Sequence, residues 1–424
     1  ITKQIWTGDI KITRNTANAA GGGIHNAGTL TLNNCTISDN ISNNYGGGLS
    51  SVGSLTLESD VVVSDNTARR GGGGICFRNG NSLTVGCVIS GNTSSSSGGG
   101  IYFDGSKLIV LSQCRISNNK AANGGGIALA SADTDDSIIS GTIIQNTATN
   151  YGGGIVVRDS TLTIDSCNIY GNSALSGGGV YIYEGATAII IDTTISNNES
   201  TYSSLDGTVA GGGGVFNAGT LEINIGTISG NTATTNGGGI CNTGKLTIYN
   251  GTISDNKATN DGGGIYNAGA LYLHGGIIGN ANATSIATST SYSNYAGNNG
   301  GGIWFSSQYF DWDGAITIFA NYAGNNGGGF YWDGSNTSGG GFRLLGLSIK
   351  YNYSELDGGG IWVSEIQPAI MESILSTNGA GNNGGGIFVK NCGKIYFRDS
   401  TEISNNFAGN NGGGIYFDGE NIYA

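Results

Sequence analysis

Proline and methionine are almost absent from this chain, since each occurs once in 424 residues. Charged residues are scarce at 11%, against about 25% in an average globular domain. Apolar residues at helical spacing are missing along the chain, and so are the residues that start and stop helices. These absences argue against a helical protein. Because 38% of the residues are still hydrophobic, the chain is not too polar to fold.

Clustered positive charge and long apolar runs are missing too. The formal net charge is −12 and no run of Lys and Arg occurs, whereas phosphate backbones require one, so we expect no nucleic-acid partner. No stretch of 18 apolar residues occurs, so we expect no insertion into a membrane. The chain starts at Ile1 without a signal sequence, which we interpret as a mature or trimmed start.

No catalytic or metal-binding arrangement stands out. Carboxylates gather at two places only: Asp133, Asp135 and Asp136, and Asp311 with Asp313. We interpret both groups as solvated loops, with a metal site or a carboxylate pair for polysaccharide cleavage as the less favoured alternative. His25 and His274 are too far apart along the chain to share a metal. We therefore predict no cofactor, no metal and no enzymatic activity.

Glycine is abundant instead, with 80 residues where average composition would give about 30. Runs of glycine precede a single apolar residue, and this pair recurs along the chain at a spacing of mostly 25 to 28 residues. The apolar residues are Ile24, Leu49, Ile75, Ile101, Ile127, Ile155, Val180, Val215, Ile240, Ile265, Ile303, Phe330, Ile361, Ile387 and Ile415. A fixed period of this length is typical of solenoid proteins.

Each unit of the repeat also contains a Leu-x-Leu segment, such as Leu30 to Leu32, and ends on Ile-x-x-Asn, such as Ile37 to Asn40. Three short alternating segments cannot bury themselves alone, but stacked units place each strand about 4.8 Å from its equivalent in the next unit. Crossovers between parallel strands are right-handed by default. The sequence therefore predicts an all-β fold, a right-handed parallel β-helix of about fifteen coils with three short parallel sheets.

The repeated glycine and asparagine residues have structural explanations in such a fold. Glycine permits positive φ and close backbone approach at a sharp corner. The Asn that ends each unit can stack on its equivalents as an internal hydrogen-bonded ladder. The expected members are Asn40, Asn66, Asn92, Asn119, Asn146, Asn172, Asn198, Asn231, Asn256, Asn280, Asn321, Asn352, Asn378 and Asn406.

Seven cysteines do not form a closed disulfide framework, and no metal-binding CxxC spacing occurs. Four of them lie two residues before the Ile of the unit-ending motif, so we expect them to point inward as small buried hydrophobes: Cys35, Cys87, Cys114 and Cys167. A disulfide between Cys87 and Cys114 stays open as an alternative. Cys76 and Cys241 follow a glycine corner and should face outward, and Cys392 should lie in a turn.

We predict one solenoid over residues 1–424, with two insertions that form surface loops. They span residues 199–209 and 281–296. The repeat changes its subtype near residue 290, after which the corner is written Ala-Gly-Asn-Asn-Gly-Gly-Gly. The register carries through this change, so we do not divide the chain there. Loops often carry recognition, although a neutral decoration is the simpler interpretation.

An aromatic row is the candidate interaction face. The residue after the corner apolar residue should face outward, and in the last five coils it is always aromatic: Trp304, Tyr331, Trp362, Phe388 and Tyr416. At about 4.8 Å spacing the rings would form an exposed row. Three interpretations remain open: the rings stabilise the face by stacking on each other, they pack against another protein chain, or they stack on sugars.

Neither end shows a capping segment, which makes the ends candidate assembly surfaces. Ile422 and Ala424 align with the Leu-x-Leu segment of a last unit that lacks its final motif. The chain begins with that motif, from Ile12 to Asn15. Residues 412–424 and 1–15, 13 and 15 residues, together make a full coil of 28. Head-to-tail stacking into a filament and a slice of a longer β-helix are the two expectations.

The paired motifs, Gly-Gly-Gly-Ile followed by Ile-x-x-Asn, resemble the Gly-Gly-Ala-Ile and Phe-x-x-Asn pair of chlamydial polymorphic outer membrane proteins. They are also similar to those of adhesin-like β-helix proteins of bacteria and archaea. Ile stands here where the chlamydial motif has Phe. The resemblance covers nearly the whole chain and implies a surface-exposed β-helix without specifying a ligand.

These observations predict an extracellular or cell-surface protein. We expect a structural protein that self-associates, head to tail, into a filament, sheath or coat. The first alternative is an adhesin or glycan-binding stalk that binds glycans or other surface proteins. The second alternative is a polysaccharide lyase or hydrolase.

Overall fold

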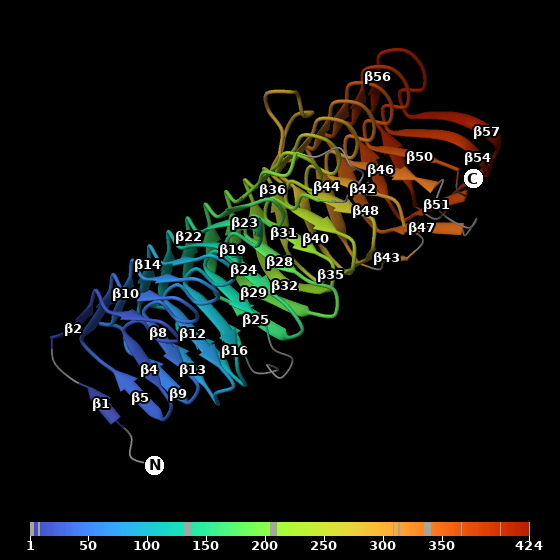
Figure 1. The fold of residues 1–424 in the computed structure, drawn as a ribbon. Helices are drawn as coiled ribbons and strands as arrows, with labels where there is room; N and C mark the ends of the chain where they lie inside the picture. The colour runs from blue at the N-terminus through green and yellow to red at the C-terminus, as the bar shows by residue number, and fades with distance from the viewer. Residues whose placement is uncertain are drawn as a thin grey trace. The chain divides into compact units, whose positions relative to one another are not determined.

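The computed structural model describes residues 4–6, 9–130, 137–203, 210–307, 309–312, 314–334, 341–365, 367–398 and 400–423. The chain divides into two compact units. Unit 1 comprises residues 1–201 and 218–221, and unit 2 comprises residues 202–217 and 222–424. In both units the described residues form short strands and no α-helix (Figure 1).

One coil of unit 1 illustrates the repeat. β4 (Ile24–Asn26) follows the glycine corner, β5 (Thr29–Leu32) is the Leu-x-Leu segment, and β6 (Cys35–Ser38) precedes Asn40. A two-residue strand, β7 (Ile41–Ser42), then leads into the next corner. Each strand pairs in parallel with its equivalent one coil further, because every coil repeats the same alternation of inward apolar residues.

Three parallel sheets result within each unit. The main sheet contains the strands equivalent to β5 and β6, and the short-strand sheet contains those equivalent to β7. The corner sheet contains the strands that follow each glycine corner. In unit 1 these are β4, β8 (Leu49–Ser51), β12 (Ile75–Arg78), β16 (Ile101–Asp104), β20 (Ile127–Leu129), β24 (Ile155–Val157) and β28 (Val180–Ile182). In unit 2 they are β31 (Val215–Asn217), β34 (Ile240–Asn242), β38 (Ile265–Asn267), β42 (Ile303–Phe305), β46 (Phe330–Asp333), β50 (Ile361–Ser364), β54 (Ile387–Arg398) and β57 (Ile415–Tyr423).

The predicted all-β fold of about fifteen coils with three parallel sheets is confirmed. Among the described residues the short-strand sheet has fifteen strands, one for each coil. The sequence did not reveal this sheet, because two residues are too few to show an alternation. We had expected the third sheet to come from the Ile-x-x-Asn segments, which instead share the main sheet with the Leu-x-Leu segments.

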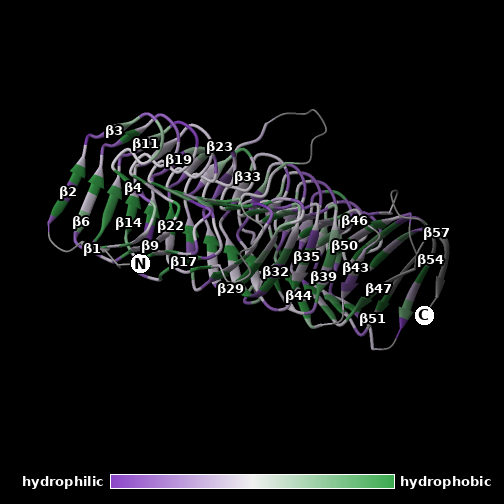
Figure 2. Ribbon diagram, turned by 60° about the horizontal axis from the view of Figure 1, so that its bottom comes forward, coloured by the Kyte–Doolittle hydropathy of each residue, from purple (hydrophilic) through white to green (hydrophobic). Residues whose placement is uncertain are grey.

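The core of each coil is filled by the inward residues of these strands. The corner residues Ile75, Ile101 and Ile127, for example, are fully buried. Strands are coloured mainly as hydrophobic and many of the turns as hydrophilic (Figure 2). In unit 2 the core also holds large rings, since Phe305 and Trp332 pack edge to face at 4.6 Å between centroids.

All seven cysteines are buried and free of disulfides. Cys35, Cys87, Cys114 and Cys167 lie inside as predicted. The thiol of Cys114 donates a hydrogen bond to the carbonyl oxygen of Cys87 at 2.9 Å, in the place of a disulfide.

Three cysteines differ from the expectation. Cys76 and Cys241 occupy outward positions, yet neither is exposed, because larger side chains such as Tyr102 and Tyr266 stand beside them on the next strand. Cys392 lies within β54, at a register shift, and not in a turn.

The asparagine ladder forms within each unit. In unit 1, the backbone N–H and the Nδ2 of Asn119 both donate to Oδ1 of Asn146, at 3.0 and 2.9 Å. Asn146 repeats this pattern on Asn172 and also donates from Nδ2 to the carbonyl oxygen of Ile116 at 2.9 Å. The chain of bonds starts at Asn15.

One expected member of the unit 2 ladder is wrong. Asn294 takes the position between Asn256 and Asn321, whereas Asn280 is exposed and receives the backbone N–H of Asn282. The insertion begins before the ladder position of this coil, so the asparagine that ends the coil follows the insertion instead of preceding it.

Glycine is required at the corners by backbone contact. Gly152 has a φ of +61°, which favours a residue without a side chain. A Cβ on the next residue, Gly153, would lie 2.4 Å from the carbonyl oxygen of Gly178 in the following coil. The stacking distance of the coils therefore excludes a larger residue at this position.

The insertions lie at the edge of the coils. In the first, Glu199–Ser200 is strand β30, and residues 204–209 fall outside the described residues. The second ends earlier than expected, since β41 (Tyr295–Ala296) is already part of the short-strand sheet. Its residues return over that sheet, where the N–H of Ala287 donates to the carbonyl oxygen of Tyr351 at 2.7 Å.

Candidate binding surface

The five aromatic residues of the candidate face lie in register on the corner sheet of unit 2. Trp304 pairs with Tyr331, Tyr331 with Trp362, Trp362 with Phe388, and Phe388 with Tyr416. Side chains alternate along each strand, so the position after a buried corner residue places every ring on the outer face. The structure therefore brings all five together.

The rings form a continuous stack. Successive ring centroids from Trp304 to Tyr416 are 6.4, 4.3, 6.2 and 4.9 Å apart, and the planes are within 12° of parallel. Tyr266 extends the stack by one coil, at 4.2 Å and 5° from Trp304. We call these six residues, Tyr266, Trp304, Tyr331, Trp362, Phe388 and Tyr416, the aromatic stack.

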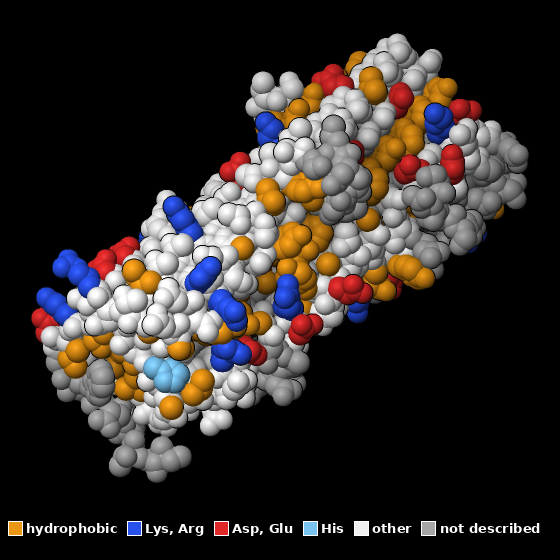
Figure 3. Space-filling model, in the orientation of Figure 1, with side chains coloured by type: hydrophobic (Ala, Val, Ile, Leu, Met, Phe, Trp, Pro, Cys, Tyr) orange, Lys and Arg blue, Asp and Glu red, His pale blue; other side chains and the backbone are white. Residues whose placement is uncertain are grey.

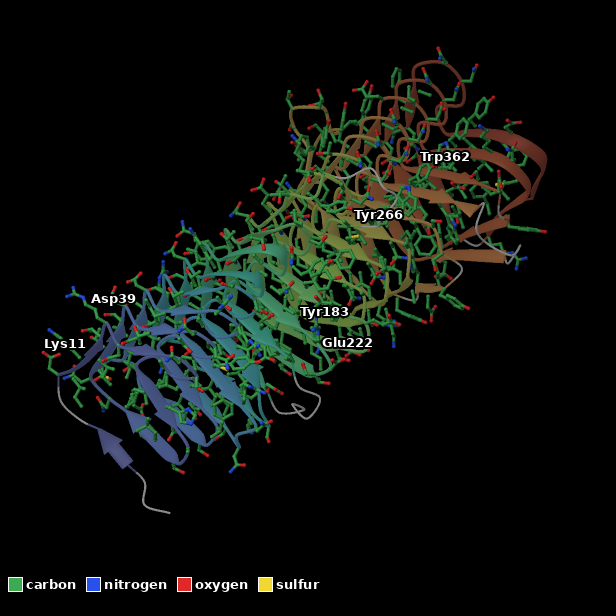
Figure 4. The ribbon with its side chains drawn as sticks, in the orientation of Figure 1. Lys11, Asp39, Tyr183, Glu222, Tyr266 and Trp362 are labelled. Atoms are coloured by element: carbon green, nitrogen blue, oxygen red, sulfur yellow. The ribbon has the colours of Figure 1, made fainter. Side chains whose placement is uncertain are left out.

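The row is less exposed than expected. Trp362 and Phe388 are only 8% and 7% exposed, and the other members of the stack are half-buried. Each ring covers the face of its neighbours, so the outer edges of the rings are what solvent meets. Hydrophobic side chains form a strip in the region where Tyr266 and Trp362 are labelled (Figures 3 and 4).

A second polar ladder lies at the glycine corners of unit 2. Its members are residues just before the glycine runs: Asn236, Asp261, Asn299, Asn326, Asp357, Asn383 and Asn411. The Nδ2 of Asn299 donates to Oδ1 of Asp261 at 3.0 Å, and Asn383 donates in the same way to Asp357. The repeated Asn-Asn-Gly-Gly-Gly of the sequence was the signal for this ladder, which we did not predict.

Burial shifts the pKa values of Asp261, Tyr266 and Tyr331 in and beside the stack. Burial raises the pKa of the Asp261 carboxyl, although the backbone and side-chain hydrogen bonds from Asn299 lower it in part. Burial also raises the pKa of the Tyr266 and Tyr331 hydroxyls; Cys241 and then Asp261 raise that of Tyr266 further, and Asp333 and then Asp261 raise that of Tyr331. Both phenols therefore keep their protons at neutral pH and can donate hydrogen bonds.

A row of tyrosines lies on the short-strand sheet of unit 2 and was not predicted from the sequence. Tyr295, Tyr322 and Tyr353 each follow a ladder asparagine, with ring centroids 5.2 and 5.9 Å apart. Tyr292 of the insertion packs on the first two, and the hydroxyl of Tyr322 donates to Glu355 at 2.5 Å. The insertion thus covers part of this row, in which Tyr322 is buried and Tyr295 and Tyr353 are half-buried.

The other candidate residues are not assembled into a site. Ile12 lies in β2 (Ile10–Thr13), and Asn15 is a terminal rung of the ladder. Ile422 pairs with Ile395 on the corner sheet, and Ala424 lies outside the described residues. Head-to-tail stacking through these four residues stays a prediction.

No chemistry-bearing cluster emerges from the part of the chain that the structure describes. Within it, no group of three or more His, Cys, Asp or Glu side chains could hold a metal ion. Asp311 is exposed, whereas Asp133, Asp135, Asp136 and Asp313 lie outside the described residues. No helix in the described segments is long and apolar enough to cross a membrane.

Two family models match the chain. The model of the right-handed β-helix region matches residues 4–141, in agreement with the predicted handedness. The repeat of the Chlamydia polymorphic membrane proteins matches residues 226–243, 250–268 and 400–418. Each of these three segments contains one Ile-x-x-Asn and the glycine corner that follows it. The chain thus resembles β-helix proteins of the chlamydial polymorphic type, and the predicted resemblance is confirmed.

Further comparison adds no relative. Neither a curated protein nor a solved structure matches the chain. The repeat matches point to a surface-exposed, adhesin-like protein.

Proposed function

We propose that this chain is the extracellular β-helical part of an adhesin-like protein, that it has no enzymatic activity, and that it binds a partner protein through the aromatic stack. The carrying observation is the six-ring stack in register on one outer face of unit 2. Rows of aromatic side chains are enriched at the centres of protein interfaces, where they supply apolar area at low entropic cost.

The ring geometry favours a protein partner over a sugar. A sugar stacks with its C–H face against the open face of an aromatic ring. In this stack the ring faces cover each other, with near-parallel planes at 4.2 to 6.4 Å, so the edges remain for contact. The neighbouring Asp and Asn ladder supplies polar groups beside the apolar strip, as at the rim of an interface.

Adhesion to cells tests this proposal. Fluorescent beads that carry the chain should adhere to cultured epithelial cells, and protease treatment of the cells should remove the adhesion while periodate oxidation of their glycans should not. Trp304→Ala and Tyr331→Ala should each lower the adhesion at least about tenfold, since central aromatic residues typically contribute 2 kcal/mol or more. Circular dichroism checks that the variants keep their fold.

Tyr249→Ala is the matched control, because Tyr249 is an exposed aromatic residue of the same unit, in the turn that follows β35 (Lys245–Ile248) of the main sheet. It should leave adhesion unchanged. Equal loss in this control, or loss on periodate treatment alone, would contradict the assignment of the stack as a protein-binding surface.

Self-association is the second candidate function. The stack has an aromatic ring at every coil. Two copies of this chain related by a two-fold axis would therefore pack their aromatic stacks against each other. In that case light scattering should show a dimer or larger assembly that dissociates in Trp304→Ala and persists in Tyr249→Ala. A monomer at all concentrations would leave the adhesin as the sole proposal.

A further inference from the structure

A groove on the corner sheet of unit 1 has a composition unlike the rest of the surface. It has a volume of about 430 Å³ and is lined mainly by polar and aromatic residues from five successive coils. Arg70 and Arg158 are its charged residues, and no carboxylate occurs among its described lining residues. The described lining of this groove is therefore positively charged, whereas the whole chain carries a net charge of −12.

The groove exists because the outward row of the corner sheet becomes small over two coils. Tyr102 is followed in register by Ala128 and Val156, and the next residue of the row is Tyr181. Ala128 and Val156 are each 3% exposed and form a deep floor. Where unit 2 has an aromatic stack, the same row of unit 1 has small residues, and two of them, Ala128 and Val156, lie between Tyr102 and Tyr181.

Tyrosine rings form one wall of this gap. Tyr45 and Tyr102 both line it and come together over Gly71, since a Cβ on Gly71 would lie 3.2 Å from the Tyr102 ring and 3.5 Å from the Tyr45 ring. The guanidinium of Arg78 lies 4.4 Å from the centroid of the Tyr45 ring and fixes that ring from outside the groove. Tyrosine thus offers an apolar surface and, through its hydroxyl, a polar contact.

Asn123 adds an unused hydrogen-bond acceptor. It lies at a register shift of β19 (Lys120–Asn123) against β23 (Thr147–Tyr151), where the strand bulges, and it lines the groove. Its Oδ1 is buried and has no hydrogen-bond partner among the described residues. A buried acceptor without a donor is destabilising, and a hydroxyl group bound beside it would supply the missing donor.

We propose that this groove binds an acidic saccharide along its length, with one carboxylate or sulfate group held by Arg70, another held by Arg158 three coils further on, and a ring hydroxyl donating to Asn123. Guanidinium groups recognise such anions through paired N–H donors. Ser96 and Ser97 at the rim supply further hydroxyl partners. An acidic peptide matches the charge but has no ring face to lie against Tyr45 and Tyr102, so a saccharide fits the lining better. This site is separate from the aromatic stack and does not depend on the function proposed for it.

Titration calorimetry with defined oligosaccharides tests the proposal on the full chain. The probes are a galacturonic acid tetramer, which carries carboxylates, and a heparin-derived tetrasaccharide, which also carries sulfates. At least one should bind with a saturable isotherm, and the stronger of the two identifies the preferred anion. The methyl-esterified galacturonic acid tetramer has the same shape without the charge and should bind at least tenfold more weakly than the acid.

Two kinds of variant locate the binding. Arg70→Gln and Arg158→Gln should each weaken it at least tenfold, whereas Arg115→Gln, the same change at an exposed position of the main sheet, should not. Ala128→Tyr fills the floor with a residue that the same row already carries at Tyr102, so the fold should tolerate it and binding should be lost.

Several results would overturn the proposal. These are the lack of saturable binding by both acidic probes, unchanged binding in Ala128→Tyr, or an equal loss in Arg115→Gln, which would indicate attraction by charge alone. Tighter binding of a poly-glutamate peptide, lost in Ala128→Tyr, would replace the saccharide by an acidic peptide. Cell adhesion through the aromatic stack is measured separately, so failure of one proposal can be told from failure of the other.

Discussion

Each ladder asparagine satisfies backbone groups that the fold would otherwise leave buried without a partner. Asn146 is fully buried, accepts two hydrogen bonds from the coil before it and donates to the carbonyl oxygen of Ile116 and to Asn172. The amide side chain is suited to this position because it carries a donor and an acceptor on one planar group. No apolar residue of similar size could replace it without orphaning these groups.

Asn146→Ala should therefore lower the free energy of unfolding by about 3–5 kcal/mol, since several buried donors and acceptors lose their partner at once. Equilibrium urea unfolding followed by circular dichroism measures this change. Asn43→Ala is the control, because the Nδ2 of Asn43 makes a hydrogen bond of 2.9 Å to Asn18 in the same coil-to-coil direction but on the exposed surface. Asn43→Ala should lower the free energy of unfolding by less than about 1 kcal/mol. An equal decrease in both variants would show that burial of the ladder does not cause the larger effect.

At the scale of the structural element, the close spacing of backbones at the glycine corner limits which residues can occupy that position of the repeat. Gly153 has an ordinary φ, so its need for glycine comes from the backbone of the next coil and not from its own conformation. Backbone atoms cannot move aside as a flexible side chain can. The corner thus fixes the stacking distance of the coils as much as the hydrogen bonds of the sheets do.

Gly153→Ala should destabilise unit 1 by more than about 3 kcal/mol, because overpacking against fixed atoms is at least as costly as overpacking in a core. The melting temperature, measured by calorimetry, reports the change. Gly28→Ala is the comparison: Gly28 lies in the turn between β4 and β5, and a Cβ there would meet nothing within 4 Å. If Gly28→Ala lowered the melting temperature as much as Gly153→Ala, the close approach of the backbones would not be the cause.

The repeated elements were predictable from the sequence, and the features that depend on neighbouring coils were not. Glycine corners and the asparagine ladder follow from residues that recur at a fixed spacing. The ladder failed at Asn280 because an insertion separates this residue from the coil that Asn294 completes. The groove at Ala128 exists because small residues lie between larger ones in adjacent coils. No sequence motif indicates such a change in side-chain size.

At the scale of the whole molecule, buried thiols couple stability to alkaline pH. Burial raises the pKa of Cys76, Cys114 and Cys167 from the ordinary value of 9.0 to about 12. Below pH 9 both the folded and the unfolded chain keep these protons, so the stability is fully present. Between pH 9 and pH 12 only the unfolded chain releases them, so the free energy of unfolding falls as the pH rises.

The expected slope is on the order of 1 kcal/mol per pH unit for each of these thiols. Urea unfolding at pH 8, 9, 10 and 11 measures it. The double variant Cys114→Ala and Cys167→Ala should be less stable at pH 8, because it leaves small cavities, yet show a shallower decline above pH 9. An unchanged slope in this variant would assign the decline to other groups, such as the buried tyrosines.

The segment between β40 (Gly276–Gly279) and β41 interrupts a coil without interrupting the asparagine ladder. More than a dozen residues leave the coil there and return, and the ladder continues from Asn256 through Asn294 to Asn321 across the interruption. The ladder beneath the segment therefore does not depend on how many residues the segment contains. Residues can be gained or lost at such a junction while the register of the stacked coils on either side of it stays the same.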